Sequence, residues 1–197
     1  SSGSLPALRR RRRPPSGFDG MNARTEKGFF LFGLAIAVII IVADQLSKWW
    51  IVFDVMRPPR IIEVFPSFNL VMGWNRGVSF GMFDSDSPIG QWLLIGLALT
   101  VVIVLLVWLK RADSRIIGLA IGLIVGGALG NVIDRIHFGA VADFLDVYIG
   151  DYHWPAFNIA DAGISVGAII LVLDSLFANQ DRDKKGAEEK EAGNDEK

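Results

Sequence analysis

Two aspartates in the last third of the chain, Asp143 and Asp161, are placed where acid chemistry at a membrane surface is possible. Each lies where a hydrophobic segment meets a short loop, and 18 positions (161 minus 143) separate them. An ionisable residue at a membrane boundary is costly unless water, a partner or a function keeps it there. The two positions therefore predict a functional site.

A pair of aspartates can hydrolyse a peptide bond. One carboxylate deprotonates the attacking water, while the other, protonated, donates to the carbonyl oxygen and then to the leaving amine. Two carboxyls held close together share a proton and titrate as a pair. The competing interpretation is that each aspartate caps or ends a helix, which is the more frequent role of a single Asp in this setting.

The composition favours a membrane protein with these acids at its surface. The chain has 197 residues, 51% of them hydrophobic, with a formal net charge of -1, and its apolar residues form long blocks between charged ones. There is no cysteine, which excludes thiol nucleophiles, disulfides and thiolate metal sites. We expect no cofactor, no metal and no nucleic-acid partner.

Four apolar segments are long enough to cross a bilayer core of about 30 Å. They cover residues 28–52, 89–109, 116–133 and 159–178. The first is too long for the apolar part of a signal peptide and lacks a small-residue cleavage pattern. Small residues in the third predict close helix packing, namely Gly118, Gly122, Gly126, Gly127 and Gly130.

The predicted fold is an all-α integral membrane protein with four transmembrane helices and a small extracytoplasmic β-containing loop region. Residues 53–88 mix β-branched and aromatic residues between prolines, which predicts two or three short strands. Three regions follow from the composition: a disordered extension over 1–20, a four-helix membrane domain over 21–179, and a disordered cytoplasmic tail over 180–197.

The distribution of Lys and Arg predicts the orientation. Seven precede the first span and three lie between the second and third, whereas the two longer remaining loops hold four. Positive residues accumulate on the cytoplasmic side, so both termini are predicted to be cytoplasmic. Asp143, Asp161 and the strand-bearing loop then share the outer face.

Several polar residues near the same face can support the two acids. The amides of Asn131 and Asn158 can donate to carboxylates or to substrate carbonyls, and Asn75 can reach a substrate backbone. Arg135 can pair with Asp134 or with a phosphate head group.

Asp44 and Lys48 stand at positions i and i+4 of the first span. This spacing favours an ion pair that makes a polar spot tolerable near the membrane rim, rather than a catalytic role.

Other chemistries remain open on the residues alone. Ser79 or Ser47 with Lys48 as base would make a serine protease. His137 and His153 do not form a paired helical motif, which disfavours a zinc protease. A proton-coupled carrier would place its acids at mid-depth and show repeats, and a purely structural four-helix protein has no reason to gather polar residues on one face.

Four groups of residues together resemble lipoprotein signal peptidase, the type II signal peptidase of bacteria. In order along the chain, the groups are Asp44, Gln45 and Lys48; Asn75, Gly77, Phe80 and Gly81; Asn131, Asp134, Arg135, Gly139, Val141, Asp143 and Phe144; and Pro155, Phe157, Asn158, Ala160 and Asp161. The resemblance covers roughly residues 21–178 and includes the four spans with their intervening loops. The arginine-rich start of the chain is not part of the pattern.

The resemblance implies an aspartic endopeptidase that removes the signal peptides of prolipoproteins by cleaving before a cysteine that carries diacylglycerol. It implies Asp143 and Asp161 as the catalytic pair. The residues expected to bind substrate or to support the pair are Asn75, Gly77, Asn131, Asp134, Arg135, Asn158, Ala160, Asp44 and Lys48. The expected partners are lipid-modified prolipoproteins and membrane lipids. The expected location is the bacterial inner membrane, with the protein acting as a monomer.

Overall fold

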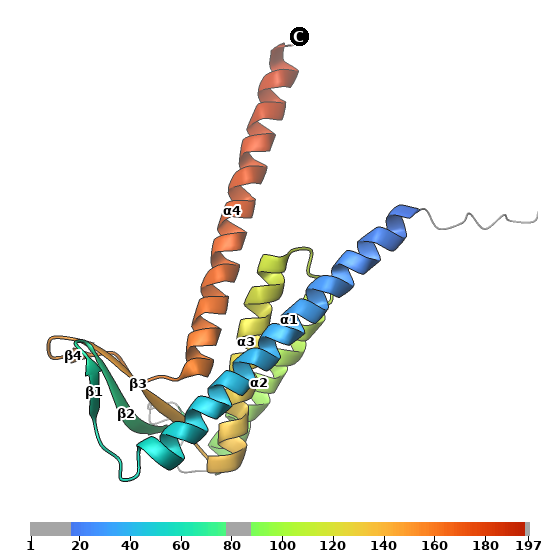
Figure 1. The fold of residues 1–197 in the computed structure, drawn as a ribbon. Helices are drawn as coiled ribbons and strands as arrows, with labels where there is room; N and C mark the ends of the chain where they lie inside the picture. Colours follow the sequence, from blue (N-terminus) through green and yellow to red (C-terminus); the bar gives the residue numbers. More distant parts are fainter. Residues whose placement is uncertain (1–16, 78–87, 196–197) are drawn as a thin grey trace, which may run out of the picture.

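The computed structural model describes residues 17–77 and 88–195, with side chains placed over 28–77 and 89–177. It contains four long helices and a small sheet at one end of the bundle that they form (Figure 1). Ser79, Phe80 and Gly81 lie outside the described residues.

The helices match the four predicted spans. They are α1 (Gly17–Trp50), continued by a π-helical turn η1 (Ile51–Val55), α2 (Pro88–Leu109), α3 (Arg115–Phe138) and α4 (Ile159–Asp195). Within them, Gly28–Val55, Ile89–Leu109, Arg115–Phe138 and Ile159–Phe177 are long and apolar enough to cross a membrane. Large apolar side chains on the outside of α1, α2 and α4 are exposed, as is appropriate for helices solvated by lipid.

Two helices extend past the predicted domain boundaries. α1 begins at Gly17 and α4 continues to Asp195, so the boundaries predicted at residues 20 and 180 fall inside helices. The segment after residue 180 is rich in Glu and Lys, which have high helix propensity, and this composition is compatible with continuation of the helix.

The glycine-rich helix α3 lies at the centre of the bundle and packs against α1, α2 and α4. A side chain added at Gly126 would place its Cβ 2.7 Å from the carbonyl oxygen of Ala37 on α1, and one at Gly127 would collide with the carbonyl oxygen of Ala160 on α4. The backbones therefore approach too closely for any residue larger than glycine. The prediction that these glycines serve helix packing is confirmed.

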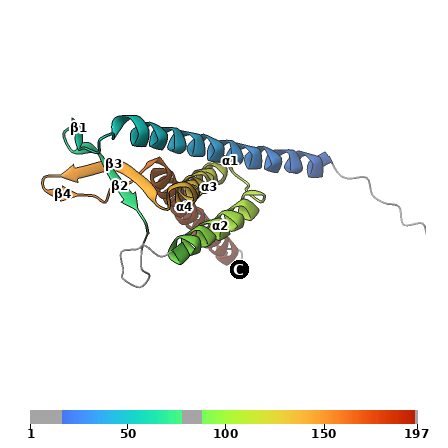
Figure 2. The ribbon, with the colours of Figure 1, turned by 90° about the horizontal axis from the view of Figure 1, so that it is seen from below.

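The sheet joins two loops that are far apart in sequence. Strands β1 (Ile62–Phe65) and β2 (Phe68–Asn75) come from the loop after α1, while β3 (Val141–Ile149) and β4 (Tyr152–His153) come from the loop after α3. All pairings are antiparallel in the order β1-β2-β3-β4. Seen from below, the sheet extends sideways from the bundle (Figure 2).

The prediction of strands in the first loop is confirmed. No strand was predicted in the second loop, which carries the longest of the described strands. α3 ends at Gly139, whose φ of 70° is the left-handed conformation that glycine adopts at little cost. The chain then enters β3, which is rich in β-branched and aromatic residues. Asp143 consequently lies on a strand rather than at the end of a helix.

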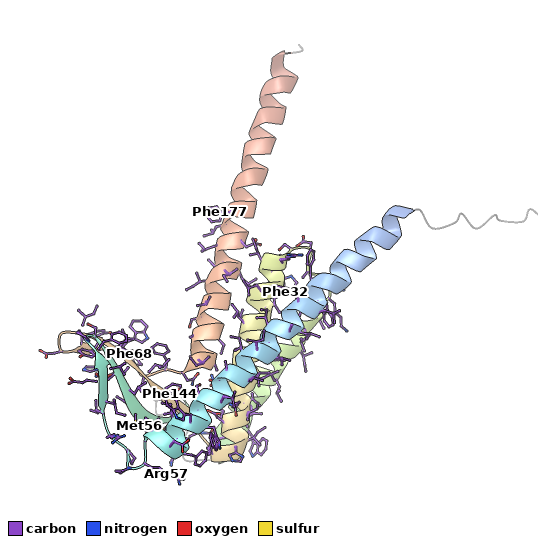
Figure 3. The ribbon with its side chains drawn as sticks, in the orientation of Figure 1. Phe32, Met56, Arg57, Phe68, Phe144 and Phe177 are labelled. Carbon is purple, nitrogen blue, oxygen red and sulfur yellow. The ribbon has the colours of Figure 1, made fainter. Side chains whose placement is uncertain are left out.

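A small apolar cluster attaches the sheet to the bundle. Ile51, Met56 and Phe144 are buried together at the junction of η1 and β3. Figure 3 shows Met56 and Phe144 at the point where the sheet meets the lower end of α1. This contact fixes the height of β3, and with it Asp143, relative to the helix ends.

Candidate active site

The two candidate acids come from different elements at the sheet end of the bundle. Asp143 is on β3 with 4% of its surface exposed, and Asp161 is half-buried in the first turn of α4. A strand thus supplies one carboxyl and a helix N-terminus the other. The positive end of the α4 dipole favours negative charge on Asp161.

Asn158 contacts both acids. Its side-chain Nδ2 donates to Asp143 Oδ1 at 2.7 Å, and its backbone N–H donates to Asp161 Oδ2 at 3.3 Å. Asn131, on α3, donates its Nδ2 to Asp161 Oδ1 at 2.7 Å, and its Oδ1 accepts from Asn158 Nδ2 at 3.3 Å. The predicted donation from both amides to carboxylates is confirmed.

Asp161 also has the capping role that the sequence left open. Asn158 Oδ1 accepts from the N–H of Asp161 at 2.9 Å, and Oδ2 of Asp161 accepts from the N–H of Asn158 at 3.3 Å. This reciprocal arrangement is a capping box at the start of α4. Only Oδ2 of Asp161 takes part in this capping box. The other oxygen, Oδ1, accepts from Asn131. Asp143 caps no helix, since it lies within β3.

The carboxyl of Asp143 is held largely in its neutral form at mildly acidic pH. Burial, together with repulsion from the charge of Asp161, raises the pKa of Asp143 to about 6. Hydrogen bonds from Asn75 and Asn158 act in the opposite direction but do not cancel the effect of burial. The pair therefore provides a protonatable acid beside a carboxylate that is hydrogen-bonded by amides.

Asn75 and Gly77 lie at the end of β2, on the same side of the molecule as Asp143. Asn75 pairs with Val141 in the sheet and contributes a side-chain hydrogen bond to Asp143. The N–H of Gly77 donates to Asn75 Oδ1 at 3.0 Å, and the φ of Gly77 is 110°, a conformation that favours glycine. Gly77 thus orients the Asn75 amide.

The predicted ion pair of Asp44 and Lys48 is present, with Lys48 Nζ 2.8 Å from Asp44 Oδ2. Both side chains are buried within the bundle, with 0% and 2% of their surface exposed. Lys48 Nζ also lies 2.9 Å from Asp134 Oδ2 and donates to Asn131 Oδ1 at 3.1 Å. Ala160, on α4, donates its backbone N–H to Asp44 Oδ1 at 2.9 Å.

Asp134 and a phosphate head group were the two partners predicted for Arg135, and the structure does not pair it with Asp134. Among the described residues Asp134 pairs instead with Lys48, whereas Arg135 makes only a long 3.4 Å bond from its guanidinium to the carbonyl oxygen of Asn131. The reason is geometric, because adjacent residues on a helix project in different directions. The Nε of Arg135 is buried and has no hydrogen-bond partner within the described part of the chain.

Sequence reasoning missed Gln45 and left Asp146 unassigned. Gln45 Nε2 donates to Asp134 Oδ1 at 2.9 Å and to Asp44 Oδ2 at 3.2 Å, and its position beside Asp44 in the first motif was the available signal. Asp146 accepts from Asn69 Nδ2 at 3.0 Å and lies 2.9 Å from His153 Nδ1. Burial opposes ionisation of Asp146, but the hydrogen bonds from His153 and Asn69 outweigh it and lower its pKa.

The serine and zinc alternatives receive no support from the residues that the structure describes. Ser47 donates its hydroxyl to the carbonyl oxygen of Asp44 at 2.8 Å, and the Lys48 ammonium is occupied by three acceptors. Ser79 lies outside the described part of the chain. Within that part, no three His, Cys, Asp or Glu side chains converge as a metal site would require.

Comparison with known proteins decides the family. The model of the family described as "Signal peptidase (SPase) II" matches residues 36–177. The chain belongs to the signal peptidase II family. It is 47% identical over 150 residues to the lipoprotein signal peptidase of Methylorubrum extorquens (strain PA1), which covers 75% of this chain and 86% of that protein. It is 40% identical over 161 residues to that of Alteromonas mediterranea, covering 80% and 87%.

Solved structures agree with this assignment. A bacterial membrane enzyme determined by the in meso method at 2.3 Å resolution is 29% identical, with a TM-score of 0.66 over 76% of this chain and 90% of the other. A second bacterial membrane enzyme, determined at 1.9 Å, is 31% identical, with a TM-score of 0.65. As a signal peptidase II, the protein is a membrane protease, and the matched segment contains every predicted site residue.

Proposed function

We propose that Asp143 and Asp161 are the catalytic pair with which this signal peptidase II cleaves prolipoproteins. The observation that carries the proposal is the position of Asn158, which hydrogen-bonds both carboxylates. The raised pKa of Asp143, caused first by burial and then by the charge of Asp161, supports the same conclusion. Aspartic proteolysis requires such a pair, with one acid and one base.

The surroundings assign a role to each acid. Asp161, at a helix N-terminus and bonded by Asn131 and Asn158, is the carboxylate that removes a proton from the attacking water. Asp143, whose pKa is raised to about 6, is the acid that donates to the carbonyl oxygen and then to the leaving amine. When substrate covers the site and excludes water, the neutral form of Asp143 is favoured further.

The substrate is a prolipoprotein whose cysteine carries diacylglycerol, and the bond cleaved precedes that cysteine. Asp143 lies on β3 and Asp161 in the first turn of α4, and Figure 1 shows that the sheet lies at the end of the bundle where α4 begins. A signal helix and acyl chains can therefore remain in the bilayer while the scissile bond reaches the two acids at its surface. Exposed apolar side chains on the sheet, among them Val64, Phe65 and Ile149, are suited to contact lipid or the lipidated segment.

The enzyme works in the bacterial inner membrane with both termini in the cytoplasm. The excess of Lys and Arg before α1 and between α2 and α3 supports this orientation. In the bundle, the start of α1 and the end of α4 lie at the end opposite to the sheet (Figure 1). A single chain supplies all the proposed site residues, so the monomer is the active unit.

The test uses purified protein in detergent and a diacylglyceryl-modified prolipoprotein. Asp143→Asn and Asp161→Asn should each lower kcat by at least about 1,000-fold, because each removes one half of the acid–base pair. Asp151→Asn, on the exposed turn between β3 and β4, is the matched control and should retain normal turnover. Substantial turnover by either site variant, in protein with an unchanged circular dichroism spectrum, would refute the proposal.

A further inference from the structure

The residues that directly precede the two proposed catalytic acids are held in the same way. The N–H of Ala142 donates to Asp134 Oδ2 at 3.1 Å, and the N–H of Ala160 donates to Asp44 Oδ1 at 2.9 Å. Both alanines are fully buried, so no water replaces these bonds. A carboxylate thus fixes the backbone one residue before each acid.

Lys48 joins the two carboxylates. Its ammonium lies 2.8 Å from Asp44 Oδ2 and 2.9 Å from Asp134 Oδ2. Its third contact is the bond to Asn131 Oδ1 at 3.1 Å, so all three N–H donors of the ammonium are used. By occupying that oxygen, Lys48 also turns the Asn131 Nδ2 toward Asp161.

Gln45 makes a second, uncharged link between the same carboxylates. Its Nε2 donates to Asp134 Oδ1 and to Asp44 Oδ2. One lysine cannot neutralise two aspartates, and the extra negative charge is compensated by neutral N–H donors from Gln45 and the two alanines. A continuous set of bonds therefore runs from β3 through α3 and α1 to α4.

We infer that Lys48, Asp44 and Asp134 form a clamp that sets the separation of Asp143 and Asp161, and that they act as positioning residues for catalysis. The inference rests on the proposed catalytic pair. This clamp grips one backbone position on β3 and one on α4, and its own members belong to α1 and α3. It connects the two elements that carry the acids through α1 and α3, in addition to the direct bonds that Phe157 and Asn158 make to β3.

A buried ion pair is weak evidence for stability, because the cost of removing charges from water offsets their attraction. Positioning gives a stronger reason for its presence. A displacement of about 1 Å in a catalytic group can cost on the order of 100-fold in rate. The clamp is therefore expected to affect the chemical step more than the binding of substrate.

Two neutralising variants test this. Asp44→Asn weakens the grip on Ala160, and Asp134→Asn weakens the grip on Ala142. Each leaves one aspartate opposite Lys48, so the buried charge is balanced. We expect kcat to fall about 10- to 100-fold in each while KM changes by less than about threefold. The pH at which kcat/KM is half-lost should also move, since repulsion between the acids depends on their separation.

Gln45→Met provides a variant that changes no charge and keeps a similar volume. It should lower kcat about three- to tenfold, with the same small effect on KM. Ser47→Ala is the matched control on the same helix, because it removes only the bond from Ser47 to the carbonyl oxygen of Asp44, and it should keep normal kcat. If the aspartate variants do not fold, the kcat and KM of Gln45→Met test the inference alone.

The inference is overturned if the folded variants keep normal kcat and pH dependence and lose only thermal stability, because the clamp would then be purely structural. That failure is distinct from failure of the proposed function. In the first case Asp143→Asn and Asp161→Asn remain inactive while the clamp variants turn over normally; in the second, Asp143→Asn or Asp161→Asn itself turns over.

Discussion

The side-chain Nδ2 of Asn158 lies 2.7 Å from Oδ1 of Asp143. This bond stabilises the ionised carboxylate, yet burial first and the charge of Asp161 second still raise the pKa of Asp143 to about 6. The proposed active site therefore holds a carboxyl that loses its proton near pH 6. Changes in the donors around Asp143 should be visible in the pH dependence of the reaction.

The first prediction concerns the alkaline limb of the pH–rate profile. In the free enzyme, kcat/KM should fall as pH rises above about 6, because Asp143 must be protonated to act as the acid. Asn75→Ala removes a hydrogen bond that lowers this pKa, so the limb should move to higher pH. The measurement is kcat/KM between pH 4.5 and 8.5 on the lipidated substrate. A limb that stays in place or moves to lower pH in Asn75→Ala would contradict the assignment.

The second prediction concerns stability. A carboxyl whose pKa is about 6 in the folded state and 3.8 when unfolded stabilises the fold below about pH 4, and this contribution is lost as pH rises through 6. Asp143→Asn stays neutral at every pH. It should therefore be more stable than the wild type at pH 7.5, by roughly 1–3 kcal/mol, with the difference vanishing near pH 4.

The six tryptophans allow this to be measured by thermal melts in detergent, followed by intrinsic fluorescence at several pH values. Asp151→Asn, on the exposed turn, should follow the wild type throughout and is the control. A melting temperature of Asp143→Asn below that of the wild type at pH 7.5 would show that the ionised carboxylate of Asp143 does not destabilise the native enzyme.

The third prediction concerns helix packing. Gly126→Ala would force a Cβ to within 2.7 Å of the carbonyl oxygen of Ala37, and backbone on both sides cannot yield easily. We expect a loss of roughly 1–3 kcal/mol. Gly96→Ala, on α2, meets nothing within 4 Å and should be neutral or slightly stabilising. Melting temperatures of the two variants in the same detergent would decide, and equal effects would mean that the close α1–α3 contact is not maintained.

The sequence was sufficient to predict the four spans, because bilayer thickness imposes a length that can be read locally. It was also sufficient for the ion pair of Asp44 and Lys48, since helical periodicity brings positions i and i+4 together. Strand β3 was missed for the opposite reason. Its main partner, β2, lies in the loop two helices earlier, so nothing adjacent in the sequence indicates the pairing.

The long-range contacts among the site residues could not be predicted from the sequence either. Lys48 pairs with Asp134, which is 86 positions away (134 minus 48), and the helical spacing of Lys48 identifies only its partner Asp44. Asp134 was one of two partners predicted for Arg135, the other being a phosphate head group, but adjacent residues on a helix project in different directions. Long-range partners of buried charges depend on the packing of whole helices, which no local pattern encodes.

Two long-range contacts also bear on the biosynthesis of the protein. They are the pairing of β2 with β3 and the bond from the N–H of Ala160 on α4 to Asp44 on α1. A chain still on the ribosome, with only its first three helices inserted, has Asp143 but neither Asp161 nor the backbone that α1 must grip. With the proposed pair of Asp143 and Asp161, the capacity for proteolysis requires that the last helix has entered the membrane, so an incomplete chain is expected to be inactive.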